Sequence, residues 1–560
     1  MHLAPMSRFS ARLLRATLLL LCTAPPAGAQ SFDVMEATIP AVHAAMRERR
    51  LTCRALVQAY LDRIAAYDKT GPALNAIQTV NPRALQEADS LDTVLRAQQP
   101  RGPLHCVPVL LKDQIETRDM PTSYGSALFK DFVPKRDATA VQRLERAGAI
   151  IIAKTTMGEF AQRFVSSAAG VIRNAYDPTR NPSGSSGGSA SAAAANFGLV
   201  AIGEDTGGSI RGPAAVSSLV GLRPTLPLVS RFGMLPANPT QDTMGPITRT
   251  VADAARVLDV IAGYDANDPV TAYAVGNVPP TYTTALEADA LRGARIGVLR
   301  IPRDTAGTRR PAGDSVALRD TTSRDSTSRD NTARRDSTAR VNAAEFRKVR
   351  PLFEKALADL RAQGAVLVDS LTTPTVRGAS LSNDYETEEA TDAYLAQHPN
   401  APVKTLKEIL LIGGVNPWRA RSMMTYVGRS TAEAGYGAVM QSREAMRVAM
   451  LKLMADHQLD AVVYATYDAP PTVIAADVLT NPRPVDGYGL GDNRSLSPTL
   501  AWPAITVPMG FTSDALPAGL EFLGRPWSEP RLFGFAYAYE QATRHRRPPA
   551  TTPSLSAARR

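Results

Sequence analysis

Residues 181–213 read NPSGSSGGSASAAAANFGLVAIGEDTGGSIRGP, with two glycine- and serine-rich turns on either side of a small-residue helix and an apolar strand. A flexible Gly/Ser linker is the simplest alternative for the first turn. Linkers, however, do not lead directly into an alanine-rich helix and a buried strand. The second turn, 204–211, is rich in glycine, which lets backbone N–H groups approach a ligand closely because it has no Cβ. This stretch therefore predicts a catalytic turn whose N–H groups converge on an oxyanion.

A lysine upstream ends another apolar, strand-like run. Lys112 follows the segment 106–111, CVPVLL. Lysine is rarely buried without a reason, and burial lowers its pKa because it disfavours the charged form. The neutral amine can then act as a base near pH 7. On this pattern alone, a surface lysine at the end of a strand is the commoner outcome.

Helical and strand-like patterns alternate along the chain. One face of a helical region within 39–68 carries an apolar stripe that consists of Leu56, Tyr60, Ile64 and Tyr67. Asp137 can cap a helix that ends at Gly148, and the apolar run 149–153 follows as a buried strand. A second helical stripe, which begins at Phe346 and ends at Gly364, leads into the strand-like run 365–368. This alternation predicts an α/β fold in which helices cover both faces of a central β-sheet.

The N-terminal segment predicts export. Residues 1–29 combine three arginines, the apolar run 16–22 and the small residues 27–29, as a secretory signal peptide does. The apolar run is too short for an ordinary membrane-spanning helix, so no stable membrane insertion is expected after cleavage. We therefore expect a periplasmic or secreted protein.

Two further segments do not have the composition of a folded core. Residues 302–342 repeat Arg, Asp, Ser and Thr with almost no large apolar side chains, which predicts a disordered surface insertion. The tail 548–560 is also predicted to be disordered. The remaining chain, 30–547, is then a single domain that this insertion interrupts.

Composition excludes several classes of function. The net charge is +10, but basic and acidic residues are interspersed, so no nucleic-acid partner is expected. Cys22, Cys53 and Cys106 lack metal-ligand spacing, and neither a metal nor another cofactor is expected. After signal cleavage, Cys53 and Cys106 remain, either paired or, as the commoner outcome, as two buried thiols.

Taken together, these stretches resemble the amidase signature family along nearly the whole mature chain. Its signature is a Gly/Ser run with a serine pair, a small-residue helix and the turn acid-x-Gly-Gly-Ser-hydrophobic-Arg-x-Pro. That turn is here 205–213, and Ser185 lies 24 positions before Ser209. Further family-like segments are KDQIET at 112–117, VGLRPT at 220–225, DTMGP at 242–246 and PAITVP at 503–508, and the segment WSEP at 527–530 looks similar to secreted bacterial peptide amidases.

The resemblance implies an α/β fold with a mixed central β-sheet and a serine amidase that needs no cofactor. Ser209 would be the nucleophile, Ser185, after a cis peptide bond, would relay its proton, and Lys112 would be the base. The N–H groups of Thr206, Gly207, Gly208 and Ser209 would form the oxyanion hole. The expected substrate is a small-molecule or peptide amide, and the pattern looks most similar to secreted bacterial peptide amidases.

Three positions depart from the family pattern. Ser183 and Cys106 stand where glycine is typical, and Ala193 stands where a larger aliphatic residue is typical. None belongs to the expected triad, so these departures bear on the shape of the pocket and not on the reaction class. The segments 120–126 and 384–395 are expected to wall that pocket.

Three other interpretations of the sequence remain open. Gly184 to Gly188 also matches GxSxG, which would make Ser186 the nucleophile of an α/β-hydrolase with a downstream histidine. His398, His457 and His545 qualify by order alone. The glutamyl-tRNA amidotransferase subunit that feeds ammonia to its partners resembles the same family, although an export signal opposes this role. A binding module that kept only the fold is opposed by the joint presence of Lys112, Ser185 and Ser209. The sequence does not give the particular amide or the oligomeric state.

Overall fold

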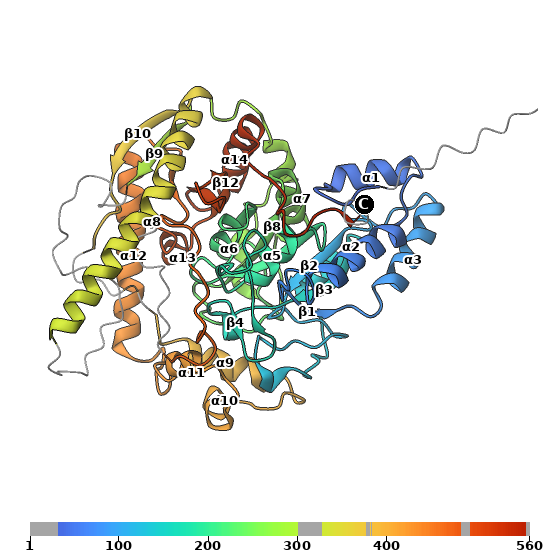
Figure 1. Cartoon of the computed structure of the whole chain (residues 1–560), viewed down its shortest axis with the longest axis horizontal. Helices are drawn as coiled ribbons and strands as arrows, with labels where there is room; N and C mark the ends of the chain where they lie inside the picture. The colour runs from blue at the N-terminus through green and yellow to red at the C-terminus, as the bar shows by residue number, and fades with distance from the viewer. Residues whose placement is uncertain (1–31, 301–327, 377–380, 382, 483–492, 556–560) are drawn as a thin grey trace, which may run out of the picture.

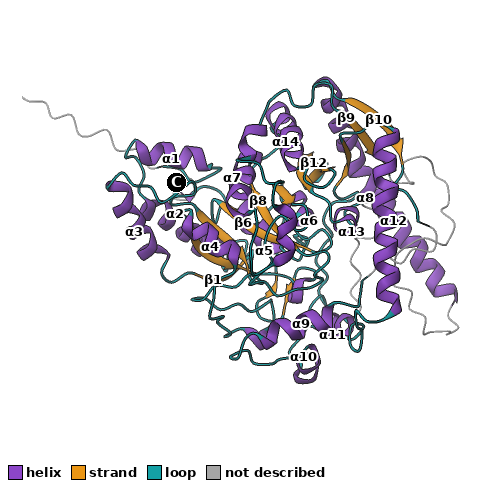
Figure 2. Cartoon of the chain, turned by 180° about the vertical axis from the view of Figure 1, so that it is seen from behind, coloured by secondary structure: helices purple, strands orange, loops and turns teal. Residues whose placement is uncertain are grey.

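The computed structural model describes residues 32–300, 328–376, 381, 383–482 and 493–555. The predicted signal peptide, 1–29, lies outside these residues. Figures 1 and 2 show the chain from opposite sides. The helices are α1 Ile39–Arg47, α2 Cys53–Tyr67, α3 Ala84–Arg96, α4 Thr139–Arg146, α5 Gly187–Ala194, α6 Arg211–Ala215, α7 Val251–Ile261, α8 Ser328–Ala362, α9 Thr387–Ala396, α10 Leu406–Ile412, α11 Pro417–Met423, α12 Ala434–Asp456, α13 Leu496–Leu500 and α14 Glu529–Thr543.

A mixed sheet forms the centre of the molecule. In the described part of the chain it has 11 strands in the order β1-β3-β2-β6-β8-β7-β12-β13-β11-β9-β10. β2 pairs in parallel with β3 and β6, whereas β6, β8, β7, β12 and β13 pair antiparallel in succession. The strands are β1 Ile77–Val80, β2 Pro108–Lys112, β3 Ile150–Thr155, β6 Val200–Asp205, β7 Val220–Arg223, β8 Thr243–Thr248, β9 Arg295–Leu299, β10 Val366–Leu371, β11 Ala461–Ala465, β12 Ala504–Phe511 and β13 Pro517–Leu523, with a separate hairpin of β4 Val165–Ser166 and β5 Gly170–Val171.

The predicted α/β class, with helices on both faces of a mixed sheet, is confirmed (Figures 1 and 2). All six residues of β3 are buried, as expected for a strand covered on both faces. The predicted stripe on α2 is also buried, and the Thr52 side chain caps this helix by accepting from the N–H of Ala55. α8, α12 and the strands β9 and β10 lie at the opposite end of the molecule from α1–α3 (Figure 1).

Two predictions of local structure need correction. Asp137 does not cap α4, because its Oδ1 accepts from the N–H of Arg118 at 2.8 Å and the helix begins one residue later, after Ala138. The predicted insertion is only partly tested: 302–327 lie outside the described residues, but 328–342 belong to α8. An anchored helix extends at little cost once its first turns exist, which the composition of the segment did not reveal.

The C-terminal tail is ordered where the structure describes it, contrary to the prediction. Arg63, which is 1% exposed, donates to the carbonyl oxygens of Thr552 and Pro553 at 2.8 Å each. The Tyr67 hydroxyl also donates to Pro553 at 3.0 Å. The described part of the tail accordingly lies beside α1 and α2 (Figure 1). A buried guanidinium needs acceptors, and backbone carbonyls of the tail provide them.

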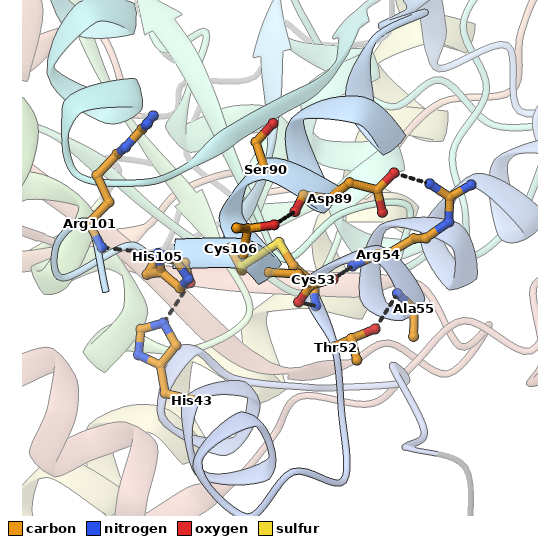
Figure 3. The surroundings of a disulfide bond; sticks show 12 residues. His43, Thr52, Cys53, Arg54, Ala55, Asp89, Ser90, Arg101, His105 and Cys106 are labelled. Atoms are coloured by element: carbon orange, nitrogen blue, oxygen red, sulfur yellow. Dashed lines mark hydrogen bonds and ion pairs between the residues drawn. A yellow bond between two sulfur atoms is a disulfide. The ribbon is translucent and has the colours of Figure 1, made fainter. Parts of the chain in front are cut away.

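Cys53 and Cys106 form a disulfide bond, so the expectation of two buried thiols is wrong. Their Cα atoms lie 5.4 Å apart, and both side chains are buried. The bond joins the start of α2 to the segment just before β2, beside the hydrogen bond between the His43 ring and the carbonyl of His105 (Figure 3). Only the packing of α2 against this segment brings the two sulfurs together.

None of the described helices is long and apolar enough to cross a membrane.

Candidate active site

Three segments bring the predicted residues together. Lys112 is the last residue of β2, Ser185 lies in the turn before α5, and Ser209 lies in the turn between β6 and α6. β2 and β6 are parallel neighbours, with Leu111 opposite Ile202. Because parallel strands end at the same edge of a sheet, Lys112 lies beside the turn that follows β6.

Lys112 is completely buried and points to Ser185. Its Nζ lies 2.8 Å from Ser185 Oγ, which is hydrogen-bonding distance. It also lies 2.7 Å from Glu204 Oε2 and 3.2 Å from the Glu204 carbonyl oxygen. These three contacts account for all three N–H groups of an ammonium, or for two N–H groups and the lone pair of a neutral amine.

The environment of Lys112 changes its acidity in two opposing ways. Burial lowers its pKa because the charged form is desolvated, and the Glu204 carboxylate works against this shift. The net direction is downward. The amine can therefore lose its proton at a lower pH than an ordinary lysine.

Ser185 follows a cis peptide bond from Gly184, as the family resemblance implied. No side chain fits at Gly184, because a Cβ there would lie 1.6 Å from the carbonyl oxygen of Arg163. The next N–H, that of Ser186, faces the carbonyl oxygen of Ser209 at 3.4 Å, which holds the two turns side by side. Ser209 is 8% exposed whereas Ser185 is fully buried, so Ser209 is the more exposed of the two serines.

The predicted oxyanion hole is only partly available. The N–H of Gly208 donates to Asp205 Oδ1 at 2.7 Å, so this one of the four predicted donors is already engaged. In the described structure, the N–H groups of Thr206, Gly207 and Ser209 donate to no other group. A Cβ at Gly207 would meet nothing within 4 Å, so the space beside this residue is open.

A buried ionic cluster holds the turn in shape. Asp205 accepts from Arg211 Nε at 3.1 Å and from the N–H of Ile210 at 3.0 Å. Burial alone would raise the pKa of Asp205, but Arg211 and Arg223 beside it lower the pKa well below its ordinary value. Asp205 therefore stays charged and fixes the backbone on both sides of Ser209.

The sequence did not assign a role to two buried carboxyl groups at the site. Glu204 contacts Lys112, and Thr206 Oγ1 lies 2.6 Å from Glu204 Oε1 and 2.7 Å from Asp242 Oδ1. A glutamate at the end of the apolar strand 199–203 is the signal that could have drawn attention to this group. Nothing local to Asp242 indicated that it would lie near Glu204.

Two of the three departures from the family pattern have a backbone explanation. Ser183 and Cys106 both have positive φ angles, 63° and 60°. Glycine is favoured in this left-handed region because it lacks a Cβ. Ser183 Oγ also forms a hydrogen bond with the hydroxyl of Tyr467, a contact that glycine could not make.

The alternative hypothesis of an α/β-hydrolase, with Ser186 as nucleophile and a histidine as base, finds no support in the described residues. Ser186 Oγ is buried and exchanges hydrogen bonds with the backbone of Glu204. His398 pairs with Glu116 at 2.8 Å, and the ring of His545 faces Asp359 at 3.8 Å. His457 directly follows α12 and accepts from Arg295 through its carbonyl oxygen. No described histidine is hydrogen-bonded to Ser186.

One predicted wall segment borders a cavity. Ala390, Ala393 and Tyr394, within 384–395, line a cavity of about 200 Å³ that Asp242 also borders. In the other segment, 120–126, Tyr124 reaches the same region through a 2.9 Å hydrogen bond between its hydroxyl and that of Tyr394.

Within the described ranges, no three His, Cys, Asp or Glu side chains are grouped as metal ligands would be.

Comparison with known proteins identifies the family. The model of the Amidase family matches residues 55–309 and 330–533. This chain belongs to the Amidase family. This amidase is 32% identical over 550 residues to the "Probable amidase" of Arabidopsis thaliana, covering 93% of this chain and 92% of that one. It is also 32% identical over 526 residues to a glutamyl-tRNA(Gln) amidotransferase subunit of an Exiguobacterium species, covering 90% of this chain and 96% of that protein.

Among solved structures, this amidase is similar to the native peptide amidase of Stenotrophomonas maltophilia. The TM-score is 0.76 at 35% identity, and the match covers 92% of this chain and 99% of the peptide amidase. The corresponding amidotransferase subunit of Thermotoga maritima gives a TM-score of 0.63 at 25% identity, with 91% of this chain and 95% of that one covered. The protein is thus an amidase-family enzyme that hydrolyses amides.

Proposed function

We propose that this amidase cleaves a carboxylic amide through an acyl-enzyme on Ser209, with Ser185 and Lys112 as its proton relay. The observation that carries the proposal is the 2.8 Å contact between the buried Lys112 Nζ and Ser185 Oγ, in the turn that lies against Ser209. A base within hydrogen-bond reach of a relay group is what proton transfer requires.

In the first step, Ser209 Oγ attacks the amide carbonyl carbon. Its proton passes to Ser185 Oγ as the proton of Ser185 passes to the neutral Nζ of Lys112. The negative charge on the substrate oxygen is stabilised by the N–H groups of Thr206, Gly207 and Ser209. Lys112 then returns its proton through Ser185 to the leaving nitrogen, and the C–N bond breaks to release ammonia or an amine.

The second half of the reaction, hydrolysis of the acyl-enzyme, uses the same groups. Water attacks the acyl–Ser209 ester and gives its proton to the relay, and the ester C–O bond breaks to release the carboxylic acid. Ser209 Oγ regains its proton through Ser185, which returns Lys112 to its neutral form. No metal or organic cofactor takes part in these steps.

For the substrate, we favour a peptide amide cleaved at its C-terminus. The similarity to the peptide amidase of Stenotrophomonas maltophilia supports this class. For the location, the composition of residues 1–29 supports export to the periplasm or the medium. A peptide amidase outside the cytoplasm would meet peptides supplied from the surroundings.

The catalytic assignment is tested with Ser209→Ala and a serine-reactive fluorophosphonate. Wild type should hydrolyse a peptide amide and carry the label on Ser209, and Ser209→Ala should lose both while keeping its circular dichroism spectrum. Ser186→Ala is the matched control, because the hydrogen bonds described for the Ser186 side chain are with the backbone of Glu204. Labelling of Ser186 instead of Ser209 would refute the assignment.

A role in a tRNA-dependent amidotransferase is the second candidate, and the similarity to the amidotransferase subunit of an Exiguobacterium species favours it. That role predicts glutamine as the amide and a cytoplasmic location. A panel of peptide amides, aliphatic amides, aryl amides and glutamine, together with fractionation of the producing cells, separates the two. Glutamine hydrolysis by a cytoplasmic protein would replace our proposal.

A further inference from the structure

Glu204 fixes the direction of the lysine nitrogen. Both side chains are fully buried, and Nζ of Lys112 contacts Glu204 through the carboxylate at 2.7 Å and through the carbonyl at 3.2 Å. A neutral amine has two N–H groups and one lone pair. If both N–H groups donate to Glu204, the lone pair faces Ser185 Oγ at 2.8 Å. Glu204 therefore orients the base toward the relay.

The other oxygen of Glu204 leads to a second buried carboxyl group. Thr206 Oγ1 lies 2.6 Å from Glu204 Oε1 and 2.7 Å from Asp242 Oδ1. A threonine hydroxyl has one proton, so it can donate to only one of the two carboxyl groups. For both contacts to be hydrogen bonds, the other carboxyl group must be protonated and donate to Thr206.

Asp242 is the carboxyl group suited to hold that proton. Its Oδ2 accepts from the N–H groups of Ala237 and Asn238 at 2.8 and 2.7 Å, which leaves Oδ1 for the proton. Burial, and secondarily the charge of Glu204, raises the pKa of Asp242 to about 7. Glu204 by contrast accepts from Lys112 Nζ through Oε2 at 2.7 Å, which leaves its Oε1 free to accept from Thr206 Oγ1.

We infer that Glu204, Thr206 and Asp242 form a proton-sharing chain behind Lys112, which orients its lone pair toward Ser185 and sets the pH range in which it acts as a base. The chain runs from Asp242 Oδ1–H to Thr206 Oγ1, and from Thr206 Oγ1–H to Glu204 Oε1. The inference rests on the proposed function, because it gives these residues a positioning role in that relay.

The total charge of Glu204 and Asp242 in this proton-sharing chain determines how readily Lys112 becomes neutral. A single carboxylate, Glu204, faces the lysine while Asp242 is protonated. When Asp242 ionises, a second negative charge favours the ammonium and opposes base catalysis. The other charged groups that act on this cluster come from neighbouring elements: Asp205 from β6, Arg223 from β7 and Arg231 from the segment between β7 and β8.

The first test is Glu204→Gln. The carboxamide oxygen can still accept from Lys112 and its NH₂ can donate to Thr206, but the negative charge is gone. An opposite charge this close shifts a pKa by about 1 to 3 units, so the acid limb of kcat/KM should move down by about one pH unit or more. A purely structural role would lower activity at every pH without moving that limb. An unmoved acid limb would overturn the inference.

The second test compares two variants of Asp242. Asp242→Asn keeps a permanent donor toward Thr206, whereas Asp242→Ala removes it. At pH 6 the Asn variant should be at least about tenfold more active than the Ala variant, since it preserves the hydrogen-bonded chain. Equal activity of the two would contradict the chain. If the Ala variant does not fold, the Asn profile alone decides, because it should lack the wild-type inflection near the pKa of Asp242, about 7.

Fluorophosphonate labelling separates the possible failures. If wild-type Ser209 is not labelled, the proposed function fails and this inference fails with it. If Ser209 is labelled in wild type and in Glu204→Gln, but the acid limb does not move, only the proton-sharing chain is wrong.

Discussion

The disulfide should contribute strongly to stability and little to catalysis. Its two cysteines, Cys53 and Cys106, are 53 residues apart, so the bond closes a long loop in the unfolded chain. Loss of that constraint lowers the free energy of unfolding by about 4 kcal/mol in the chain-entropy treatment. Lys112 should stay in place, because β2 remains hydrogen-bonded to β3 on one side and to β6 on the other.

The assay is equilibrium unfolding in urea, followed by tryptophan fluorescence, with and without a phosphine reductant. It is done in a Cys22→Ala background so that only the Cys53–Cys106 pair responds. Reductant should move the midpoint to lower urea by the equivalent of about 4 kcal/mol. It should leave the midpoint of the Cys53→Ala, Cys106→Ala double variant unchanged.

Activity of the double variant under native conditions should stay within about threefold of wild type, because the β2 ladders are intact. Equal midpoints with and without reductant would refute the stability argument. So would two free thiols in unfolded, unreduced protein. A large loss of kcat in a folded double variant would show that the bond also positions Lys112.

Three other predictions follow from the site and the tail. Lys112→Ala should remove most amide hydrolysis near pH 7 and abolish the ascending limb of the pH profile, which reflects deprotonation of a lysine whose pKa burial has lowered; loss of that limb in a histidine variant instead would reassign the base. Removal of 548–560 should cost about 3 kcal/mol in urea unfolding, because the buried Arg63 loses acceptors on Thr552 and Pro553, and an unchanged midpoint would argue against this docking. The lowered pKa of Asp205 means that its contribution to stability is complete above its unfolded pKa of about 4 and decreases as pH falls toward the native value; acid unfolding of Asp205→Asn should therefore show a smaller dependence on pH than wild type, and identical acid profiles would contradict this.

Much of the candidate site consists of short segments whose residues are contiguous in the sequence. The serine pair, the glycine-rich turn and the lysine at the end of an apolar run each belong to one short segment, and each segment forms a turn or strand end for local reasons. The family resemblance then related Lys112, Ser185 and Ser209 to one another, and the structure places Lys112 and Ser185 in contact. The buried stripe of α2 could also be predicted, because helical periodicity is a local property.

The tertiary structure alone decided which groups meet across long separations. Asp242 lies 36 positions from Thr206, and it reaches that hydroxyl because β8 pairs with β6. The tail meets Arg63 across 489 positions, and the composition of the tail gave no sign of its docking. Periodicity and motifs report the environment of a segment, whereas a hydrogen bond between distant residues depends on the packing of whole elements. Sequence therefore determined the reaction class and located the proposed nucleophile, and the folded chain determined which carboxyl groups surround the proposed base.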